Sequence, residues 1–300
     1  MPTEDVSARF VDLDGWPTRD AVEAMYEGQL SAVAAVRPAL GVIAAAVDAA
    51  AEALGRGGRL VYAGAGTSGR VGVQDGAELP PTFDWPYERL VFAMAGGQGA
   101  LVRSAEGAED DETEGRRAID AAGIGPDDVV IGIAASGTTP YTVAAVRRAA
   151  ERGAVTIGIA NNEGAPLLGA ARFPVLAETG AEVVAGSTRM KAGTAQKVVL
   201  NLLSTAIMVR LGRVHGGMMV HMHASNAKLH RRAADMVVRL TGVDHTEATE
   251  ALRRSNWDVK KAVLVLHGQS PQEAADLLDG SNGVLRAALA ALDEGSGSGC

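Results

Sequence analysis

The sequence predicts an α/β fold in which helices flank a five-stranded parallel sheet. From Arg59 onward, short apolar runs alternate with helical stretches, and glycine- and hydroxyl-rich turns follow two of the runs. Apolar strands that alternate with helices are typical of a parallel sheet covered on both faces. Ligands of such sheets bind at the carboxyl ends of the strands, where both turns lie. The pattern therefore indicates a small-molecule site at this edge.

Five apolar runs rich in β-branched residues are the predicted strands. They cover residues 60–63, 90–94, 129–134, 155–160 and 173–176. Runs of this length that are bounded by turn residues fit buried strands. We assign residues 49–225 to the domain that this sheet organises.

The N-terminal region is predicted to be an arm followed by helices. Residues 1 to about 18 resemble an extended, weakly ordered arm, and Thr18 is the expected N-cap of the first helix. A second helical pattern from about Leu30 to Leu54 is expected to be broken or kinked near Pro38. Residues 1–48, which hold the arm and these helices, are a candidate clamp for a partner subunit.

The C-terminal region is predicted to be a small helical domain over residues 226–294. A long helix that ends near Gly212 and a helix over about 220–240 come before most of it. The further helices expected are 246–255, 258–267, 270–278 and one near 283–292. Each of the first three begins at a capping residue. The glycine- and serine-rich residues 295–300 are expected to be a flexible tail.

Composition argues against several classes of protein. The chain has 300 residues and a net charge of −8, whereas nucleic acids and acidic membranes call for basic surfaces. The single cysteine, Cys300, excludes an internal disulfide and fits a reducing compartment. The acidic N-terminus lacks the apolar core of a secretory signal, and the apolar stretch 198–211 is too short and polar to span a bilayer. We expect a cytoplasmic protein that binds no nucleic acid and no membrane.

The first turn has the sequence Gly64-Ala65-Gly66-Thr67-Ser68-Gly69 and formally matches the dinucleotide-binding pattern G-x-G-x-x-G. That pattern also requires an acidic residue about 20 positions later to hold the ribose. The second strand ends without one, and Asp75 and Glu78 come too early. Gly66, Thr67 and Ser68 instead suit a phosphate monoester held by hydroxyls and by N–H groups at a helix start. A turn that merely packs helix on strand is the alternative.

The second turn has the sequence Ser136-Gly137-Thr138-Thr139-Pro140. Ser136, Thr138 and Thr139 place three hydroxyls at a helix start, whereas an ordinary N-cap needs only one. Taken with the first turn, this one favours a second contact to a sugar phosphate.

Carboxylates in two places are candidates for acid and base catalysis. Glu78 precedes Pro80 and Pro81 and has apolar neighbours, which can raise a carboxyl pKa and suit a general acid. Glu106 and Glu109 lie in an acidic run, where like charges can also raise a pKa. Solvated glutamates are the alternative in both places.

A third group of polar residues precedes the long helix. Ser187 or Thr188 is its natural N-cap, and the cations Arg189 and Lys191 could hold a second anionic group. Surface charge is the alternative, but the helix dipole disfavours cations at a helix start. Metal chemistry is not expected from His221-Met222-His223, because residues two apart on a helix do not face each other.

Longer motifs carry a family resemblance. The stretches concerned are 64–70, 77–82, 106–110, 132–137 and 180–197, within a resemblance that spans about residues 40–292. Together they resemble the N-acetylmuramic acid 6-phosphate etherases, members of the sugar isomerase (SIS) superfamily. The resemblance implies a SIS-type sheet that binds a sugar phosphate, a homodimer, no metal and no other cofactor. The C-terminal helices resemble a ubiquitin-associated fold.

The resemblance also implies a reaction, the cleavage of the D-lactyl ether of N-acetylmuramic acid 6-phosphate during cell-wall sugar recycling. By motif match, Glu78 would be the acid that assists lactate departure, and Glu109 would be the base, with Glu106 as the fallback. The phosphate would contact Ser68 and the hydroxyls of the second turn. Two carboxyls in different environments suit this acid and base work.

The chain departs from the family pattern at several positions. Thr138 stands where an arginine is usual, His221 stands where an aspartate is usual, and Gly28-Gln29 replaces an acidic pair. Leu79 also replaces a cysteine, but Glu78 is kept. These departures bear on the exact substrate more than on the fold.

Three other functions stay open at this stage. A non-catalytic regulator that senses a sugar phosphate would not need Glu78 or Glu109, and both are present. An aldose–ketose isomerase on the same fold would differ in its product. A dehydrogenase would show a dependence on nicotinamide.

Overall fold

The computed structural model describes residues 1–103, 105–222 and 226–297. The chain divides into two compact units. Unit 1 comprises Met1–Glu78 and Pro86–Thr205, and unit 2 comprises Leu79–Trp85 and the chain from Ala206 onward. The domain boundaries predicted from the sequence stay a prediction.

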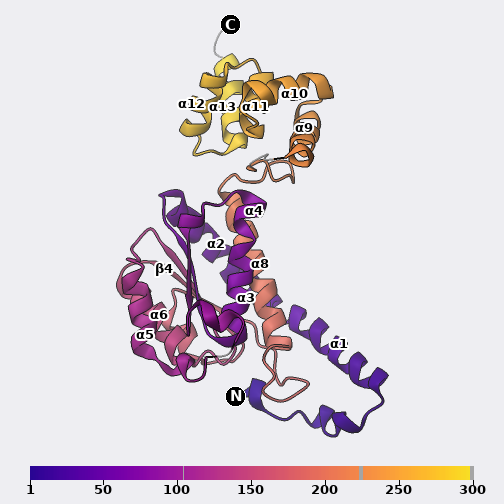
Figure 1. The fold of residues 1–300 in the computed structure, drawn as a ribbon, viewed down its shortest axis with the longest axis vertical. Helices are drawn as coiled ribbons and strands as arrows, with labels where there is room; N and C mark the ends of the chain where they lie inside the picture. The colour runs from indigo at the N-terminus through magenta and orange to yellow at the C-terminus, as the bar shows by residue number, and fades with distance from the viewer. Residues whose placement is uncertain (104, 223–225, 298–300) are drawn as a thin grey trace. The chain divides into compact units, whose positions relative to one another are not determined.

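A five-stranded sheet with the strand order β2-β1-β3-β4-β5 forms the centre of unit 1 (Figure 1). Every neighbouring pair is parallel, which confirms the predicted fold class. The register pairs Gly64 of β1 with Met94 of β2 and Ile133 of β3, so these three strands end at one level. The strands are β1 (Leu60–Gly64), β2 (Leu90–Met94), β3 (Val129–Ile133), β4 (Val155–Ala160) and β5 (Phe173–Leu176).

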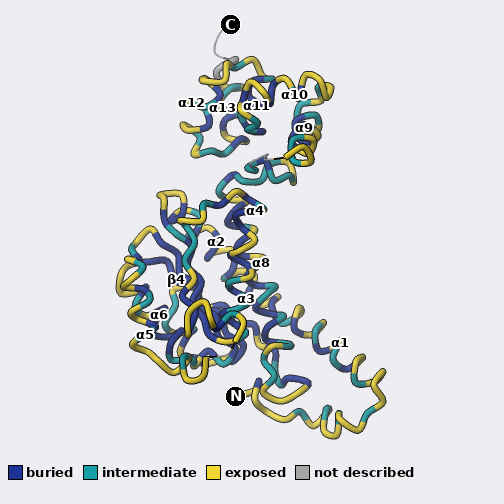
Figure 2. Tube along the Cα trace, viewed as in Figure 1, coloured by how far each residue is buried: buried dark blue, intermediate teal, exposed yellow. Residues whose placement is uncertain are grey.

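Helices cover both faces of this sheet. Ile119 of α5 and Ala145 of α6 pack against Val61 and Val130 on one face. Side chains of the neighbouring positions point the other way because strand residues alternate, and Tyr62 lies against α3 there. The three inner strands β1, β3 and β4 are buried throughout, as Figure 2 shows for β4, whereas the edge strands β2 and β5 are partly exposed. The helices concerned are α2 (Leu40–Gly55), α3 (Gly66–Ala77), α5 (Glu112–Ala121), α6 (Pro140–Glu151), α7 (Pro166–Ala170) and α8 (Lys191–Arg210).

The helical region before the sheet has the break predicted near Pro38, but its helices have other bounds. Residues 18–34 form one helix, α1 (Thr18–Ala34), and the short 3-10 helix η4 (Arg37–Ala39) joins it to α2. Pro38 in η4 has no backbone N–H to donate, so an α-helix cannot continue through it unbroken. Thr18 is the first residue of α1 and not its cap, because Pro17 occupies the N-cap position.

The N-terminal arm is anchored, in contrast to the predicted weakly ordered segment. It contains η1 (Pro2–Glu4), η2 (Ala8–Phe10) and η3 (Leu13–Gly15). Thr3 is fully buried, and its hydroxyl accepts a hydrogen bond of 3.0 Å from the Asn162 amide. The Thr3 carbonyl also accepts the Gly186 N–H at 3.2 Å. Long-range polar contacts, which a local pattern does not reveal, hold the arm in place.

Unit 2 contains a separate helical core. Its helices are α4 (Leu79–Phe83), α9 (Ala227–Thr241), α10 (His245–Arg254), α11 (Val259–Leu266), α12 (Pro271–Gly280) and α13 (Leu285–Gly297). Asp244, Asp258 and Ser270 cap α10, α11 and α12 through their side chains. The helix expected from about 220 begins at Ala227, where Asn226 caps it. α13 extends three residues into the predicted tail, and residues 298–300 lie outside the described part.

Two helical stretches are long and apolar enough to pass a membrane-span test by length and composition. They are Thr18–Gly55 and Lys191–Arg210. The first is interrupted by η4, and in the second Val199, Leu203 and Ile207 are fully buried in the protein. A buried core helix passes the same test, so this finding does not identify a membrane protein. The expectation of no membrane partner stays a prediction.

Candidate functional site

The first turn joins β1 to α3 through a close approach of two backbones. Ala65 is extended, and Gly66 opens α3 with a φ of +54°, which favours glycine. A side chain at Gly69 could not fit, because its Cβ would lie 2.3 Å from the Met94 sulfur and 2.9 Å from the Gly64 carbonyl oxygen. The glycines therefore seat the helix start directly at the carboxyl end of β1. The N–H groups of this helix start are available to an anion.

A pocket of about 470 Å³ opens beside this turn and holds both glutamates of the acidic run. Its polar lining joins Thr67 and Arg70 of α3 to Glu106 and Glu109. Both carboxylates belong to exposed residues. Small residues complete the walls, namely Ala65, Gly66, Ala95, Ala100, Ala105, Gly107 and Ala108 together with Met94. The first turn and two carboxylates thus meet in one cavity.

The loop between β2 and α5 carries these glutamates. It contains η6 (Gln98–Leu101) and η7 (Ala108–Asp110), and Gly107 caps η7 in the left-handed conformation with a φ of +71°. Glu109 lies in η7, whereas Glu106 precedes the cap. Ala108 packs against a small cluster that includes Ala65 and Tyr141.

The second turn lies at the end of the neighbouring strand β3. Gly137 has a φ of +68°, and a Cβ there would lie 2.4 Å from the Ala165 methyl group. The Thr138 hydroxyl donates to the Ser136 hydroxyl at 3.0 Å. Thr139 occupies the N-cap position of α6 but makes no side-chain capping bond. The turn thus offers more hydroxyls than capping uses, although its residues do not line the pocket beside the first turn.

The start of α8 is already occupied by a carboxylate of the protein itself. Glu182 is fully buried, and its two oxygens accept the backbone N–H groups of Lys191 and Ala192 at 2.9 Å each. A carboxylate at this position interacts favourably with the positive end of the helix dipole. The N–H groups at this helix start are therefore less available to a substrate anion than those of α3.

The cations Arg189 and Lys191, predicted to hold a second anionic group, have different surroundings in the structure. The Lys191 ammonium donates to the carbonyls of Thr179 and Ala181, and burial lowers its pKa. Ser187 is half-buried, and Arg189 is exposed. A Cβ at Gly193 would lie 3.6 Å from the Thr67 methyl group, so the start of α8 lies near the first turn. Lys191 therefore has a structural partner, whereas Arg189 remains open to solvent.

Glu78 lies apart from the pocket. It is the exposed C-cap residue of α3, and Gly66 is the first residue of that helix. A helix of this length rises about 18 Å, at ~1.5 Å per residue. Glu78 and the first turn are thus at opposite ends of one helix.

Sequence reasoning did not find the partners of three polar residues, of which Arg70 lies at the pocket, Glu182 at the start of α8, and Asp75 farther along α3 and outside the pocket lining. Arg70 binds loop carbonyls beside the pocket, and Glu182 caps α8. Asp75 is 2% exposed, and it accepts hydrogen bonds from Tyr62 at 2.9 Å and Asn201 at 2.8 Å. A buried acid in a glycine-rich helix has no local signature, since its partners come from distant segments. The position of Arg70 directly after the first turn was the available signal.

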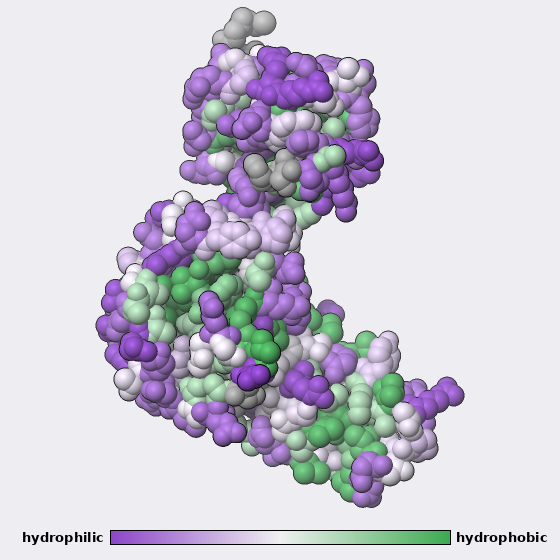
Figure 3. Space-filling view, viewed as in Figure 1, coloured by the Kyte–Doolittle hydropathy of each residue, from purple (hydrophilic) through white to green (hydrophobic). Residues whose placement is uncertain are grey.

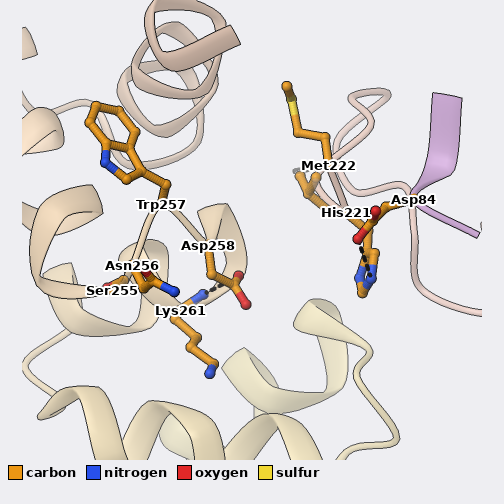
Figure 4. Close-up of a pocket in the computed structure, with 9 residues that line it drawn as sticks. Asp84, His221, Met222, Ser255, Asn256, Trp257, Asp258 and Lys261 are labelled. Atoms are coloured by element: carbon orange, nitrogen blue, oxygen red, sulfur yellow. Dashed lines mark hydrogen bonds and ion pairs between the residues drawn. The ribbon is translucent and has the colours of Figure 1, made fainter. Parts of the chain in front are cut away.

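A different pocket, of about 290 Å³, lies within unit 2 and contains His221. Figure 4 shows His221 and Asp84 on one side of it and Asn256 and Lys261 on the other. Burial, with the nearby Lys260 and Arg213 cations, lowers the pKa of His221 to about 3. His221 is therefore neutral near pH 7, and its 3.8 Å approach to Asp84 is not an ion pair there.

Metal binding is not indicated in the part of the chain that the structure describes. No three His, Cys, Asp or Glu side chains gather there as possible ligands. His223, considered with His221 from the sequence, lies outside the described residues. The expectation of a metal-free site stays a prediction.

Comparison with known families agrees with this architecture. A SIS domain model matches residues 114–206, and a model of the glucokinase regulatory protein N-terminal SIS domain matches residues 42–150. A Bacteroides fragilis structure assigned as a phosphosugar isomerase involved in capsule formation shares the fold. It has a TM-score of 0.50 and 22% identity over 67% of this chain and 99% of its own. The sheet, the two turns and these matches define a SIS-domain protein.

Curated relatives identify the family more closely. The N-acetylmuramic acid 6-phosphate etherase of Deinococcus radiodurans is 51% identical over 96% of this chain and 94% of its own length. The etherase of Streptomyces avermitilis is 45% identical over 97% and 94%, and that of Cronobacter sakazakii is 46% identical over 93% and 94%. The chain belongs to the N-acetylmuramic acid 6-phosphate etherase family.

Proposed function

We propose that this protein is a carbon–oxygen lyase that cleaves the D-lactyl ether of N-acetylmuramic acid 6-phosphate. The products are N-acetylglucosamine 6-phosphate and D-lactate, which places the reaction in cell-wall sugar recycling. One structural observation supports the proposal in addition to the family to which the chain belongs. Glu106 and Glu109 share a pocket with Gly66 and Thr67, so a base and a phosphate-binding turn face one substrate-sized cavity.

The proposed binding mode uses the helix start for the phosphate. The N–H groups of the first turn and the hydroxyls of Thr67 and Ser68 take the phosphate oxygens. Hydroxyls of Ser136 and Thr139 at the end of β3 supply further contacts. This arrangement directs the sugar carbons along the pocket toward Glu109.

The proposed chemistry proceeds by elimination and hydration. The sugar opens to its aldehyde, which acidifies the hydrogen on C2, and the Glu109 carboxylate removes that proton. The electron pair forms the C2–C3 double bond as the C3–O bond breaks, and an acid protonates the departing lactate oxygen. Water then adds at C3, and a proton returns to C2. Protons balance over the cycle, and no oxidant is required.

Glu78 can serve as this acid only if it reaches a site other than the pocket of its own chain. The length of α3 separates it from Gly66 by about 18 Å, well beyond hydrogen-bond reach. We therefore propose that Glu78 of one chain completes the site of a second copy. This arrangement requires a homodimer.

An apolar stripe on α1 supports such a dimer. Val22, Tyr26, Leu30 and Val33 are 49–61% exposed, and their spacing puts them on one helix face. The arm beside α1 adds Val6, which is 74% exposed, and Val11. Figure 3 shows apolar atoms gathered over this region. Contiguous apolar surface of this kind is typical of a protein interface, and a second copy of the chain is its proposed occupant.

The remaining parts of the proposal follow from the chemistry. No step needs a metal or a redox cofactor. The substrate is a small sugar phosphate, and the net charge of −8 does not favour nucleic acid. A bacterial cytoplasm is the proposed compartment, because phosphorylated sugars and a free cysteine are both compatible with it.

One experiment separates this function from its rivals. The purified protein is incubated with N-acetylmuramic acid 6-phosphate in heavy-oxygen water, and D-lactate and the label are followed by mass spectrometry. Lactate release with the label in the sugar is the expected result. Binding of the sugar phosphate without release of lactate would contradict the proposal and favour a regulator. The match to the glucokinase regulatory protein SIS domain makes a regulator the alternative to test. A ketose product would favour an isomerase.

A further inference from the structure

We propose that Arg70 is a positioning residue for this reaction and holds the loop that carries Glu109 against α3. The inference rests on the proposed function, because it assigns a purpose to the base at Glu109. Arg70 lies one helical turn after Gly66 and lines the pocket together with Glu106 and Glu109. It therefore belongs to the helix that starts at the first turn, and it contacts the loop that carries the base.

The contacts of Arg70 are directed at the backbone of η6. Its Nε donates to the carbonyl oxygens of Ala100 and Leu101 at 3.1 Å each, and Nη2 donates to Ala100 at 2.9 Å. Arg70 is half-buried, and Ala100 is 4% exposed. Hydrogen bonds from a guanidinium are charge-assisted, so they are stronger than neutral ones, and here they join segments 30 positions apart.

Such an anchor matters because the backbone hydrogen bonds that η6 makes among the described residues are local. Within the loop, Ala100 N–H donates to Gly97, and Val102 and Arg103 N–H groups both donate to Gly99. Gly96 and Gly97 both adopt positive φ values, and glycine restricts the backbone less than any other residue, so these two positions do not stiffen the loop. Short-range turns shape the loop, and its place relative to α3 depends on the Arg70 hydrogen bonds and on the packing of Ala108 against the cluster that contains Ala65.

One contact before Glu109 in the chain and one after it limit the movement of this residue. Arg70 fixes η6 on one side, and Asp111 on the other side caps α5 by accepting the Glu114 N–H at 2.9 Å. Loss of the Arg70 bonds would free only the first side. Glu109 would shift, whereas the phosphate turn, which belongs to α3 itself, would stay in place.

Arginine suits this role better than lysine. A planar guanidinium presents donors in a fixed fork, which can span two consecutive carbonyls. A lysine ammonium keeps the charge but provides one compact donor group on a flexible stem. Arg70→Lys therefore separates the effect of charge from the effect of the anchored loop.

The test compares Arg70→Gln and Arg70→Lys with Arg103→Gln, which removes an exposed arginine from the same loop. Two reactions are measured, lactate release from N-acetylmuramic acid 6-phosphate and hydrogen–deuterium exchange at C2 of N-acetylglucosamine 6-phosphate. The second reaction needs the base but has no lactyl group. We expect kcat for lactate release and the exchange rate to fall together by about 100-fold, since a misplacement of about 1 Å can cost that much. KM should change less than about threefold, because the phosphate turn is intact.

Three outcomes would overturn the proposal. Arg70→Lys with full activity would show that charge alone matters. A raised KM for the lactyl substrate with unchanged C2 exchange would mean that Arg70 binds the lactate carboxylate directly. Unchanged backbone amide exchange over the loop in Arg70→Lys would show that the loop is held by other contacts. A wild-type protein that releases no lactate would instead contradict the proposed function itself, so the two failures are distinguishable.

Discussion

The buried carboxylate of Glu182 accepts the backbone N–H of Lys191 at 2.9 Å and so closes the start of α8. Its second oxygen accepts the N–H of Ala192 at the same distance. The sequence predicts that the cations Arg189 and Lys191, beside this helix start, hold a second anionic group of the substrate. The protein instead supplies the anion from its own chain.

Removal of this cap should destabilise the fold. Glu182→Ala leaves two buried N–H groups without an acceptor, so we expect a loss of about 2–3 kcal/mol in the free energy of unfolding. Glu182→Gln keeps one acceptor oxygen and should lose about half as much. Urea unfolding measures both, with Glu178→Gln as the exposed control from the same loop. A loss below about 0.5 kcal/mol in Glu182→Ala would refute the cap.

The shared site predicts complementation between two inactive variants. Glu78→Gln and Glu109→Gln should each abolish turnover while the protein still folds and binds the sugar phosphate. A mixed dimer contains one site with both carboxyls, so co-expression of the two variants should restore about a quarter of wild-type activity. The measurement is lactate release from the co-purified mixture. No recovery in a mixture that forms mixed dimers would contradict the shared site, and full activity in either single variant would remove that residue from its role.

Thr138 offers a test of the second turn. It is exposed, and its hydroxyl contacts Ser136 at 3.0 Å, so an arginine can be accommodated there at the cost of one hydrogen bond. Thr138→Arg should tighten phosphate binding and lower KM about fivefold, which corresponds to about 1 kcal/mol. Thr138→Ala is the matched control for the lost hydroxyl. An unchanged KM in Thr138→Arg would show that the phosphate lies elsewhere.

Alkaline stability should report on a buried tyrosine. Burial, together with the nearby Glu114 carboxylate, raises the pKa of Tyr141 to about 12. An unfolded tyrosine ionises near pH 10, so between about pH 10 and 12 the unfolded state loses a proton that the folded state keeps. Stability is therefore complete below pH 10 and falls as the pH rises, by at most about 1.4 kcal/mol per pH unit for one tyrosine. Tyr141→Phe should reduce this slope in urea unfolding, and an equal slope would contradict the assignment.

Close packing of α3 on the sheet predicts opposite effects for two glycines. Gly69→Ala forces a methyl group to within 2.3 Å of the Met94 sulfur and 2.9 Å of the Gly64 carbonyl oxygen. Overpacking of this kind costs about 1–3 kcal/mol and should also lower activity, since it moves the phosphate turn. Gly41→Ala, in the exposed surface of α2 with open space around it, should stabilise the protein by about 0.5–1 kcal/mol. Thermal unfolding measures both, and equal effects would contradict the packing argument.

The sequence by itself determined the sheet and its turns. Strands β2, β4 and β5 occupy the predicted residues, and β1 and β3 differ by one residue at their ends. These features are readable because apolar runs and glycine positions act through neighbouring residues. The family was also readable, because its motifs are contiguous stretches of chain.

Only the tertiary structure decided which side chains share a cavity and which already have partners. Arg70 meets Ala100, and Glu182 meets Ala192, through folding that brings separate segments together. The helix that separates Glu78 from the first turn likewise converts a nearby sequence position into a distant spatial one. Local patterns do not encode such contacts, because hydrogen bonds and burial depend on the whole path of the chain.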